Sequence, residues 1–408
     1  MLQIKPILAA LKRHRAGTIL IVLQIALTLA IVCNALFIIE QRVAHMSRPT
    51  GMTESNLLTI QNHWVGVDAG KIPSQTEADL RALRQLPGVE DATQTDTFPL
   101  LQNGSVEGIR LDPNMKPRIT LAAEYFVDDH ALPTMGAQLI AGRNFRADEI
   151  HVVDPAAERP PPEVIITKAL ADMLYPNGSA LGKPIYVGNS RPSPSTVIGI
   201  VKRLQAPSPN VNFVECAVLL PALLAGNDGN YLIRSKPGQL ADIVNDAPAT
   251  LIKLDRMRTF SPDGGIRTFD VVRAQAYESD RGIAIVLGVI CVVLLIITGA
   301  GIVGLTSFWV GQRRKQIGVR RALGATRGDI LSYFLTENFL ISLGGLLIGT
   351  VLAISLSEWL VIRFEMQRLS IPYLLLSSIV LLLLGQAATL TPALRASRVP
   401  PVEATRSV

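Results

Sequence analysis

Charged residues, cysteines and histidines are scarce in this chain of 408 residues. Asp, Glu, Lys and Arg together make up 18% of it, whereas about 25% is usual in a soluble domain. The three cysteines and five histidines form no cluster with the spacing of metal ligands. Cys216 is the only cysteine outside four long apolar runs, so no disulfide can form within the region around it. The sequence therefore predicts neither a metal centre nor a disulfide-stabilised fold.

Motifs of catalytic and nucleotide-binding sites are also missing. Gly178-Ser-Ala-Leu-Gly182-Lys183 is similar to a phosphate-binding loop at first sight, but three residues separate its glycines and Pro184 follows the lysine. Such a loop needs four residues between the glycines and a Ser or Thr after the lysine. Nucleophile-elbow and zinc-protease patterns are absent as well. The sequence predicts that this chain is not an enzyme and holds no cofactor or metal.

Four long apolar runs are what the chain does have. A helix rises 1.5 Å per residue, so about 20 apolar residues cross a hydrocarbon core about 30 Å thick. The first run is longer than the apolar core of a cleaved signal peptide, which favours an uncleaved anchor. The few polar residues within the runs are expected to face a neighbouring helix or to cap a helix end: Gln24, Asn34, Glu337 and Asn338. We predict four transmembrane helices, at 18–39, 282–310, 330–362 and 371–391.

The distribution of Lys and Arg predicts how these helices are oriented. Basic residues gather in the amino-terminal segment 1–17, in the segment 311–329 and in the tail 392–408. With four spans, these three segments share one side of the membrane, and an excess of Lys and Arg marks the cytoplasmic side. Residues 40–281 and the short loop 363–370 are then extracytoplasmic. The net charge of +6 follows from this topology, so no nucleic-acid partner is expected.

The region between the first and second apolar runs is long enough to fold by itself. Short β-branched stretches predict strands, and helices are expected between them. One helix is predicted to start at Thr76, with Asp79 as its capping-box acid and Gly88 at its end, and another spans 240–254. Pro-rich stretches at 155–162 and 191–194 are interpreted as surface loops. The predicted fold is α-helical in the membrane, with a large α+β domain of two subdomains at 40–281. Its predicted strands lie at 57–60, 163–166, 183–187, 196–201 and 231–234.

The segment between the second and third apolar runs carries the most informative pattern. In Gln312–Asp329, small, apolar and basic residues recur at helical spacing, at Ile317, Arg320 and Gly324. Thr326 can cap the following helix, whose first turn holds Asp329. A basic anchor would explain the Arg and Lys residues but not the run Gly-Val-Arg-Arg-Ala-Leu-Gly-Ala-Thr. Arg313, nearer the membrane end, is expected to matter less than Gly324.

This segment resembles a known signature. Residues 314–330, Arg-Lys-Gln-Ile-Gly-Val-Arg-Arg-Ala-Leu-Gly-Ala-Thr-Arg-Gly-Asp-Ile, look like the cytoplasmic signature of the MacB/FtsX-like ABC transporter permeases. Further matches to that family lie at 124–145, 164–171, 181–201 and 392–404. MacB itself carries a nucleotide-binding domain before its first membrane helix, whereas about 17 residues precede that helix here. The chain is therefore similar to the split version of the family, in which the ATPase is a separate protein.

The resemblance implies a partner set and a mechanism. It implies a multi-pass protein of the bacterial inner membrane that works as a homo- or heterodimer bound to separate ABC ATPase subunits, with ATP and Mg on the ATPase. A periplasmic membrane-fusion protein and an outer-membrane channel are further implied partners. ATP-driven motion would pass through the segment 311–329 to the periplasmic domain, which exports or expels a substrate. The residues implied to couple to the ATPase are Gln316, Ile317, Gly318, Arg320, Arg321, Ala322, Gly324, Ala325 and Thr326.

Two other functions within the same resemblance stay open. In the first, the chain is a lipoprotein-release permease, whose outside domain takes lipoproteins from the membrane. In the second, it is an FtsX-like transmembrane regulator that switches a periplasmic hydrolase and transports nothing. The long outside domain with its Gly-Arg-Asn-Phe segment at 142–145 favours the MacB branch. A membrane-fusion partner encoded beside the gene would support that branch, and a hydrolase activator there would support the regulator.

Overall fold

The computed structural model describes residues 15–112, 119–153, 161–188, 193–224, 226–261, 264–364 and 367–400. The chain divides into two compact units, which we call the strand-rich unit (Ser47–Glu278) and the helical unit (Met1–Met46 with Ser279–Val408). Most of the Pro-rich stretches 155–162 and 191–194 lies outside the described residues. The same holds for most of the segment 1–17, for part of the loop 363–370 and for 401–408 of the tail. Expectations for those parts stay predictions.

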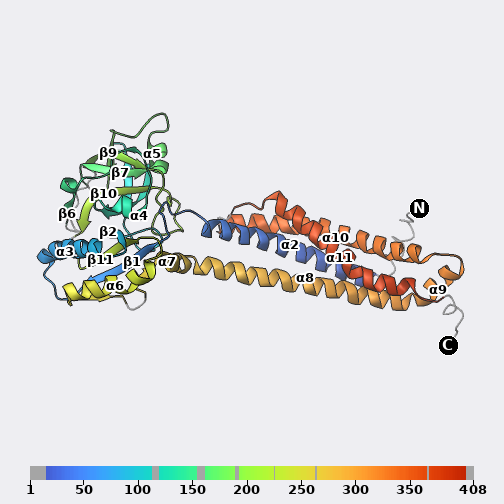
Figure 1. Ribbon diagram of the computed structural model, residues 1–408. Helices are drawn as coiled ribbons and strands as arrows, with labels where there is room; N and C mark the ends of the chain where they lie inside the picture. Colours follow the sequence, from blue (N-terminus) through green and yellow to red (C-terminus); the bar gives the residue numbers. More distant parts are fainter. Residues whose placement is uncertain are drawn as a thin grey trace. The chain divides into compact units, whose positions relative to one another are not determined.

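The strand-rich unit is built on one 13-stranded sheet (Figure 1). The strands alternate with helices α3 (Ile72–Gln85), α4 (Ala131–Met135), α5 (Lys168–Leu174), α6 (Leu240–Leu254) and α7 (Phe269–Ala276). All five predicted strands and the helix at 240–254 are confirmed, so the domain is α+β as expected. The strands are β1 (Leu57–Trp64), β2 (Val89–Thr95), β3 (Val106–Arg110), β4 (Thr120–Val127), β5 (Leu139–Gly142), β6 (His151–Val153), β7 (Glu163–Thr167), β8 (Pro184–Val187), β9 (Ser193–Val201), β10 (Ala217–Leu224), β11 (Asp228–Ser235), β12 (Arg258–Phe260) and β13 (Ile266–Thr268).

One half of this sheet closes on itself. The strand order runs β4-β3-β8-β9-β7-β10, and β10 also pairs in parallel with β4. Because side chains alternate along a strand, every second residue points into the closed half. A core of small and branched residues fills it, including Ile109, Val164, Val197 and Val218. The first hydrophobic core of the unit therefore lies inside this ring of strands.

The other half is an open sheet covered by helices. Here β12, β1, β11 and β2 lie side by side, and β2 joins β4. Leu58 and Ile60 of β1 and Ile233 of β11 point to the same face as Leu83 of α3 and Leu251 of α6. These residues form a second buried core, separate from the first. The division of this unit into two subdomains stays a prediction.

The predicted start of α3 was wrong, and so was the role given to Asp79. The helix begins at Ile72, where Pro73 occupies the first turn, a position that proline favours because its missing N–H needs no partner there. Asp79 lies in the middle of the helix. Its side chain is 1% exposed and binds Arg258 with both oxygens, at 2.7 and 2.9 Å. The carboxylate thus pairs with a distant strand and caps nothing.

Further groups complete this buried ion pair. Tyr231 of β11 donates its hydroxyl to Asp79 Oδ2 at 2.7 Å. The guanidinium of Arg258 lies 4.1 Å from the centre of the Trp64 ring, within range of a cation–π contact. It also reaches the side-chain oxygen of Asn62 at 3.4 Å. The pair therefore ties α3 to three strands of the open sheet, β1, β11 and β12.

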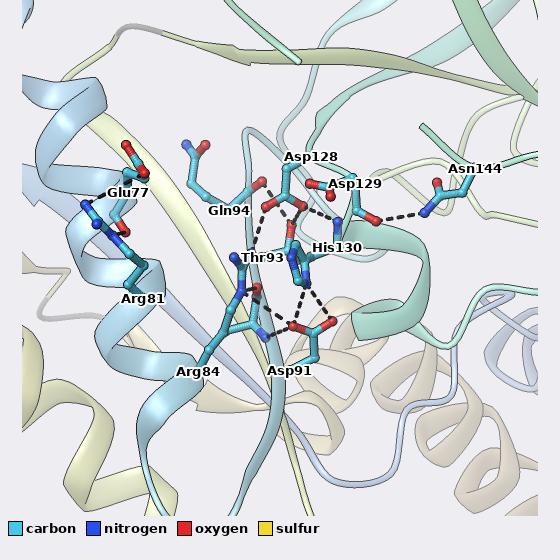
Figure 2. A network of polar contacts seen from close by, with 11 residues as sticks. Glu77, Arg81, Arg84, Asp91, Thr93, Gln94, Asp128, Asp129, His130 and Asn144 are labelled. Atoms are coloured by element: carbon cyan, nitrogen blue, oxygen red, sulfur yellow. Dashed lines mark hydrogen bonds and ion pairs between the residues drawn. The ribbon is translucent and has the colours of Figure 1, made fainter. Parts of the chain in front are cut away.

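A second polar network joins α3 to the residues after β4 (Figure 2). Arg84 donates to Asp128 at 3.1 Å and to the carbonyl of Ala92 at 2.8 Å. Thr93 donates its hydroxyl to Asp128, and His130 Nδ1 lies 2.9 Å from Asp91 Oδ1. Burial raises the pKa of Asp128 to about 6, although Thr93 and Arg84 act to lower it. The network fixes the chain where β4 leaves the sheet.

Within its described residues, the helical unit contains four long helices and the short helix α9 (Figure 1). The long ones are α2 (Arg15–Met46), α8 (Glu278–Gln312), α10 (Arg327–Phe364) and α11 (Ile371–Ser397). Each is long and apolar enough to cross a membrane. All four extend beyond the predicted spans. The fourth was expected to end near 391, but the helix continues through Pro392 to Ser397, so the first residues of the predicted tail are helical.

The polar residues within these helices contact neighbouring helices. Asn34 of α2 donates to the carbonyl of Ala353 in α10 at 3.1 Å. Gln24 of α2 donates to the carbonyl of Ile297 in α8 at 3.1 Å. The expectation for polar groups in the apolar runs is confirmed for these two residues. They bind α2 to two other helices.

Two glycines let α2 and α10 approach closely, and a side chain there is expected to separate the helices. A Cβ at Gly349 would lie 2.9 Å from the carbonyl oxygen of Ala26 and 3.0 Å from its Cα, which are backbone atoms and cannot turn away. Gly345, one turn earlier, is equally close to Ile25. We expect Gly349→Val to destabilise the helical unit by about 1–3 kcal/mol, as overpacking does. Thermal unfolding in detergent measures this.

Gly304→Val is the matched control. Gly304 lies on the long helix α8, and among the described residues no atom outside the nearby turns of α8 itself lies within 4 Å of a Cβ placed there. The same change in size should therefore leave the unfolding temperature within about 2 °C of the parent protein. Equal unfolding temperatures for both variants would contradict close packing at Gly349.

Candidate functional site

The coupling segment, residues 311–329, folds as a short helix between two turns. Helix α8 ends at Gln312, and Arg313 leaves helical geometry with φ −98° and ψ 9°. Helix α9 (Arg314–Ala322) follows at once. The third apolar helix then begins at Arg327. The segment that carries the family signature is thus an ordered element of the helical unit.

Gly324 makes the turn after α9. Its φ is +99°, in the region that side chains other than glycine avoid. The Gly324 N–H bonds to the Arg321 carbonyl, and the Ala325 N–H bonds to the Arg320 carbonyl, both at 3.1 Å. This pair of hydrogen bonds is the Schellman motif, which satisfies the last carbonyls of a helix. A glycine is therefore required at this position for backbone reasons.

Thr326 caps the next helix, as predicted. The Asp329 N–H bonds to the Thr326 hydroxyl oxygen at 3.2 Å, and the Asp329 carboxylate accepts from the Thr326 N–H at 2.9 Å. The reciprocal bonds form a capping box. The hydrogen bonds from Thr326 hold the pKa of Asp329 below its usual value. The geometry fixes the angle at which α10 leaves the turn.

One side of α9 is buried inside the helical unit. Ile317 is 4% exposed and packs with Ile330 and Phe334 of α10 and with Ala393 of α11. Gly318 is buried beside it. We had expected Ile317 and Gly318 to share a docking face with Ala322 and Gly324. The structure corrects this, because the apolar side chain of Ile317 is already covered by α10 and α11.

The opposite side of α9 and the following turn are exposed. Val319 is 45% exposed and Leu323 is 83% exposed. Sequence reasoning missed both residues, although their spacing of four places them on one helical face. Ala325 and Arg321 are half-buried. The other predicted coupling residues lie on the exposed side: Gln316, Arg320, Ala322, Gly324 and Thr326.

The adjacent arginines Arg320 and Arg321 of the signature make contacts within the helical unit. Arg321 Nη1 donates to the carbonyls of Ser397 and Val399, at 3.2 and 2.9 Å. These carbonyls lie at the end of α11, where no intrahelical donor is left. The Arg320 guanidinium lies 4.8 Å from the ring centre of Tyr333 in α10. Each arginine therefore fixes α9 to a different long helix.

Arg313 forms a buried ion pair with Glu337. Its Nη1 lies 3.0 Å from both carboxylate oxygens, and the two side chains are 9% and 3% exposed. Glu337 thus faces a neighbouring element, as predicted for polar residues of the apolar runs. The pair fixes the start of α9 to α10, and the expectation that Arg313 matters less than Gly324 stays a prediction.

The exposed side of α9 is a surface that another molecule could contact. Among the residues described, no three His, Cys, Asp or Glu side chains gather in a way that could hold a metal ion. Three sets of contacts attach α9 to α10 and α11: the Ile317 cluster, the Arg321 hydrogen bonds and the Arg313–Glu337 pair. A movement of α9 would therefore pull on both long helices. An element bound to Leu323 and Val319 could therefore displace these two helices.

Two protein families match this chain. The FtsX-like permease C-terminal family matches residues 288–401, which include α9 and its turn. The MacB-like periplasmic core domain family matches residues 18–249, more than half of the chain. This chain belongs to the MacB/FtsX-like permease family. The predicted resemblance is confirmed, including the position of the MacB-like core domain between the first and second apolar helices.

Two curated relatives of this MacB/FtsX-like permease share one name with each other. The macrolide export ATP-binding/permease protein MacB of Bartonella henselae is 28% identical over 82% of this chain and 48% of its own length. The protein of that name from Bartonella quintana is 26% identical over 97% of this chain and 58% of its own length. The chain thus spans about half the length of these curated relatives. Their names describe ATP-binding and permease functions together, and this chain matches the permease family.

A solved structure of the family overlaps weakly with this permease. The periplasmic region of MacB from Actinobacillus actinomycetemcomitans aligns over 57% of this chain and 97% of its own length, at 15% identity and a TM-score of 0.34. That score is too low to support an argument. The family membership rests on the family matches.

Proposed function

We propose that this chain is the permease subunit of a MacB-type ABC transporter that exports or expels a substrate across the cell envelope. The four apolar helices cross the bacterial inner membrane, with both termini in the cytoplasm and the strand-rich unit in the periplasm. The concentration of Lys and Arg in 1–17, 311–329 and 392–408 supports this orientation. ATP and Mg bind to a separate ATPase, and this chain converts the ATPase motion into movement of its helices.

The observation that carries this proposal is the two-sided character of α9. Its outer side presents Val319 and Leu323 to solvent on one helical face, where a partner could cover both side chains. Its inner side is packed and hydrogen-bonded to α10 and α11. A partner that binds the outer side thereby acts on two membrane helices. The separate ATPase is the partner that the family implies.

The proposal assigns roles to the remaining partners. A second permease chain, identical or different, completes the membrane part. A periplasmic membrane-fusion protein and an outer-membrane channel would continue the path from the strand-rich unit outward. No ATP-binding motif is needed in this chain, because the nucleotide acts at the ATPase. The substrate is recognised outside the membrane.

Leu323→Asp is expected to release the ATPase. Leu323 is the most exposed large apolar residue of the segment, and removal of such an interface anchor often costs about 2 kcal/mol or more. This corresponds to roughly 30-fold weaker binding. The test is co-purification of the ATPase with the tagged full chain, together with ATP hydrolysis by the complex. Leu323 is a cleaner target than Gly324, where any side chain also strains the turn.

Leu254→Asp supplies the matched control. Leu254 ends α6 in the strand-rich unit and is 49% exposed, so the same change is made on a surface not assigned to the ATPase. The control variant should retain the ATPase fully. The coupling role of α9 would have to be abandoned if Leu323→Asp also retained the ATPase and its transport-linked hydrolysis.

A further inference from the structure

Two segments of chain connect the strand-rich unit to the long helices. The unit begins at Ser47, directly after α2 ends at Met46, and it ends at Glu278, the first residue of α8. Residues 47–55 therefore follow α2, and α7 with Tyr277 precedes α8. We call these the first and the second connecting segment. Each long helix is linked to the strand-rich unit through one of them.

Arg273 contacts both connecting segments. It lies in the last turn of α7 and donates to Glu54 Oε1 and to the backbone carbonyl of Arg48, each at 2.7 Å. Its guanidinium lies 5.6 Å from the centre of the Tyr277 ring, within range of a cation–π contact. A guanidinium has five N–H donors in a fixed plane, so it can hold a carboxylate and a carbonyl at the same time. One side chain thus joins the first segment to the second.

Buried polar groups extend this contact. Thr50 donates its hydroxyl to the same Glu54 oxygen at 2.6 Å, and its carbonyl accepts from the Gln205 N–H at 2.8 Å. The side-chain amide of Gln205 donates to the Tyr277 hydroxyl at 3.2 Å. Thr50, Gln205 and Tyr277 are each 3% exposed or less. Together with Arg273 and Glu54 these residues form one connected group, which we call the Arg273 cluster.

A similar group joins α2 and α8 within the helical unit. Asp280 lies in the first turn of α8, and its side chain is 8% exposed. Its Oδ1 lies 2.6 Å from Arg42 Nη1, and its Oδ2 lies 2.9 Å from His45 Nδ1. Both partners belong to the last turns of α2. We call these three residues the Asp280 cluster. The two helices are thus joined within a few residues of the points where the connecting segments begin.

Elsewhere α8 is packed loosely. In its most apolar stretch 11% of the residues are buried, compared with 56% in that of α2. Its contacts with α2 there include the Thr28 and Thr298 hydroxyls at 2.8 Å and the hydrogen bond from Gln24. Small sliding movements of packed helices are a common way in which proteins change shape. Because apolar packing holds α8 weakly, the polar clusters at its end decide whether α2 and α8 move together there.

We propose that Arg273 and Asp280 are positioning residues that make the two connecting segments respond together when the long helices move. A displacement of α8 would reach α7 first, and the Arg273 cluster would pass it to residues 47–55. Without that cluster, α7 could follow α8 while residues 47–55 stayed with α2. This inference rests on the proposed function, because the movement originates at the ATPase.

Amide hydrogen exchange of the purified full chain tests the Arg273 cluster without the ATPase. Arg273→Met keeps an apolar stem of similar length but removes the donors, so residues 48–54 and α7 should exchange at least 10-fold faster. Peptides of β7 and β8, which belong to the core inside the ring of strands, should exchange as in the parent protein. Arg146→Met is the matched control, because Arg146 pairs with Glu149 only three residues later and is 66% exposed.

The second experiment uses the complex with the co-purified ATPase, with a non-hydrolysable ATP analogue as the probe. In the parent complex, the analogue should change the exchange rates of both connecting segments at least 3-fold. In Arg273→Met, α7 should still respond, whereas residues 48–54 should not. Asp280→Asn keeps the shape of the side chain but weakens the pair with Arg42, so it should also separate the two responses. Arg146→Met should respond like the parent.

Different results contradict the inference and the proposed function. The inference is overturned if the analogue changes both segments in Arg273→Met as it does in the parent. It is also overturned if Arg273→Met alone accelerates exchange in β7 and β8 as much as in α7, since the cluster would then only stabilise the fold. A parent complex in which the analogue changes neither segment would instead contradict the proposed function.

Discussion

Asp79→Ala is expected to destabilise the strand-rich unit by about 3–5 kcal/mol, the cost of leaving one member of a buried ion pair alone. The substitution leaves the Arg258 guanidinium, 1% exposed, without its counter-ion. It also removes the acceptor of the Tyr231 hydroxyl. Amide hydrogen exchange of β1 and α3 in the full chain measures the effect. A loss of this size speeds exchange by global opening about 100-fold or more.

The control for this prediction is Asp172→Ala. Asp172 pairs with Lys168 on the surface of α5, and both side chains are more than half exposed. Exposed pairs contribute about 0–1 kcal/mol, so exchange in the same peptides should barely change. The double variant Asp79→Leu with Arg258→Met removes both charges and should recover much of the stability. Exchange at parental rates in Asp79→Ala would show that the pair does not hold the fold.

Glu337→Ala is expected to release α9 from the helical unit, at a cost of about 3–5 kcal/mol to the packing around it. The buried Arg313 loses both of its 3.0 Å contacts and must turn toward water. The amides of α9 should then exchange much faster than those in the middle of α10. ATP hydrolysis in the complex should continue but lose its link to transport, because α9 would move without its neighbours.

Lys315→Ala is the control at the same helix end. Lys315 lies two residues further along the chain and is exposed. Surface changes of this kind usually stay within about 0.5 kcal/mol. The assignment of Arg313 and Glu337 as positioning residues fails if Glu337→Ala leaves the exchange of α9 as slow as in the parent protein.

Local patterns in the sequence were enough to predict the long helices and part of the remaining local structure of this chain. The four long helices could be predicted from their runs of apolar residues. Such a run is visible in the sequence without any knowledge of tertiary contacts. The capping box of Thr326 and Asp329 depends only on residues three apart. Helix α6 is bounded by its own amphipathic pattern, and its ends agree with the prediction.

The errors arose where distant residues meet. Asp79 fits a capping box by spacing, but its partner Arg258 lies 179 residues later, and no local pattern indicates that pairing. In the sequence, Arg313 does not differ from the other basic residues of its segment. Its partner Glu337 lies 24 residues later, and no local pattern indicates the pair. Leu323 was missed because its exposure depends on which side of α9 packs against α11. Tertiary contacts of this kind decide which of several similar side chains reaches the surface.

The bonds from Arg321 to Ser397 and Val399 also have a consequence for synthesis. The acceptors lie 76 and 78 residues after the arginine. At roughly 5–20 residues per second, the ribosome makes them several seconds after α9. During that time α9 lacks the Arg321 hydrogen bonds and the apolar contacts from α11. Its outer side, which we assign to the ATPase, is therefore not yet held in its final position. Only chains elongated through Val399 can form both bonds, so α9 reaches its final packing only after the last long helix has been made.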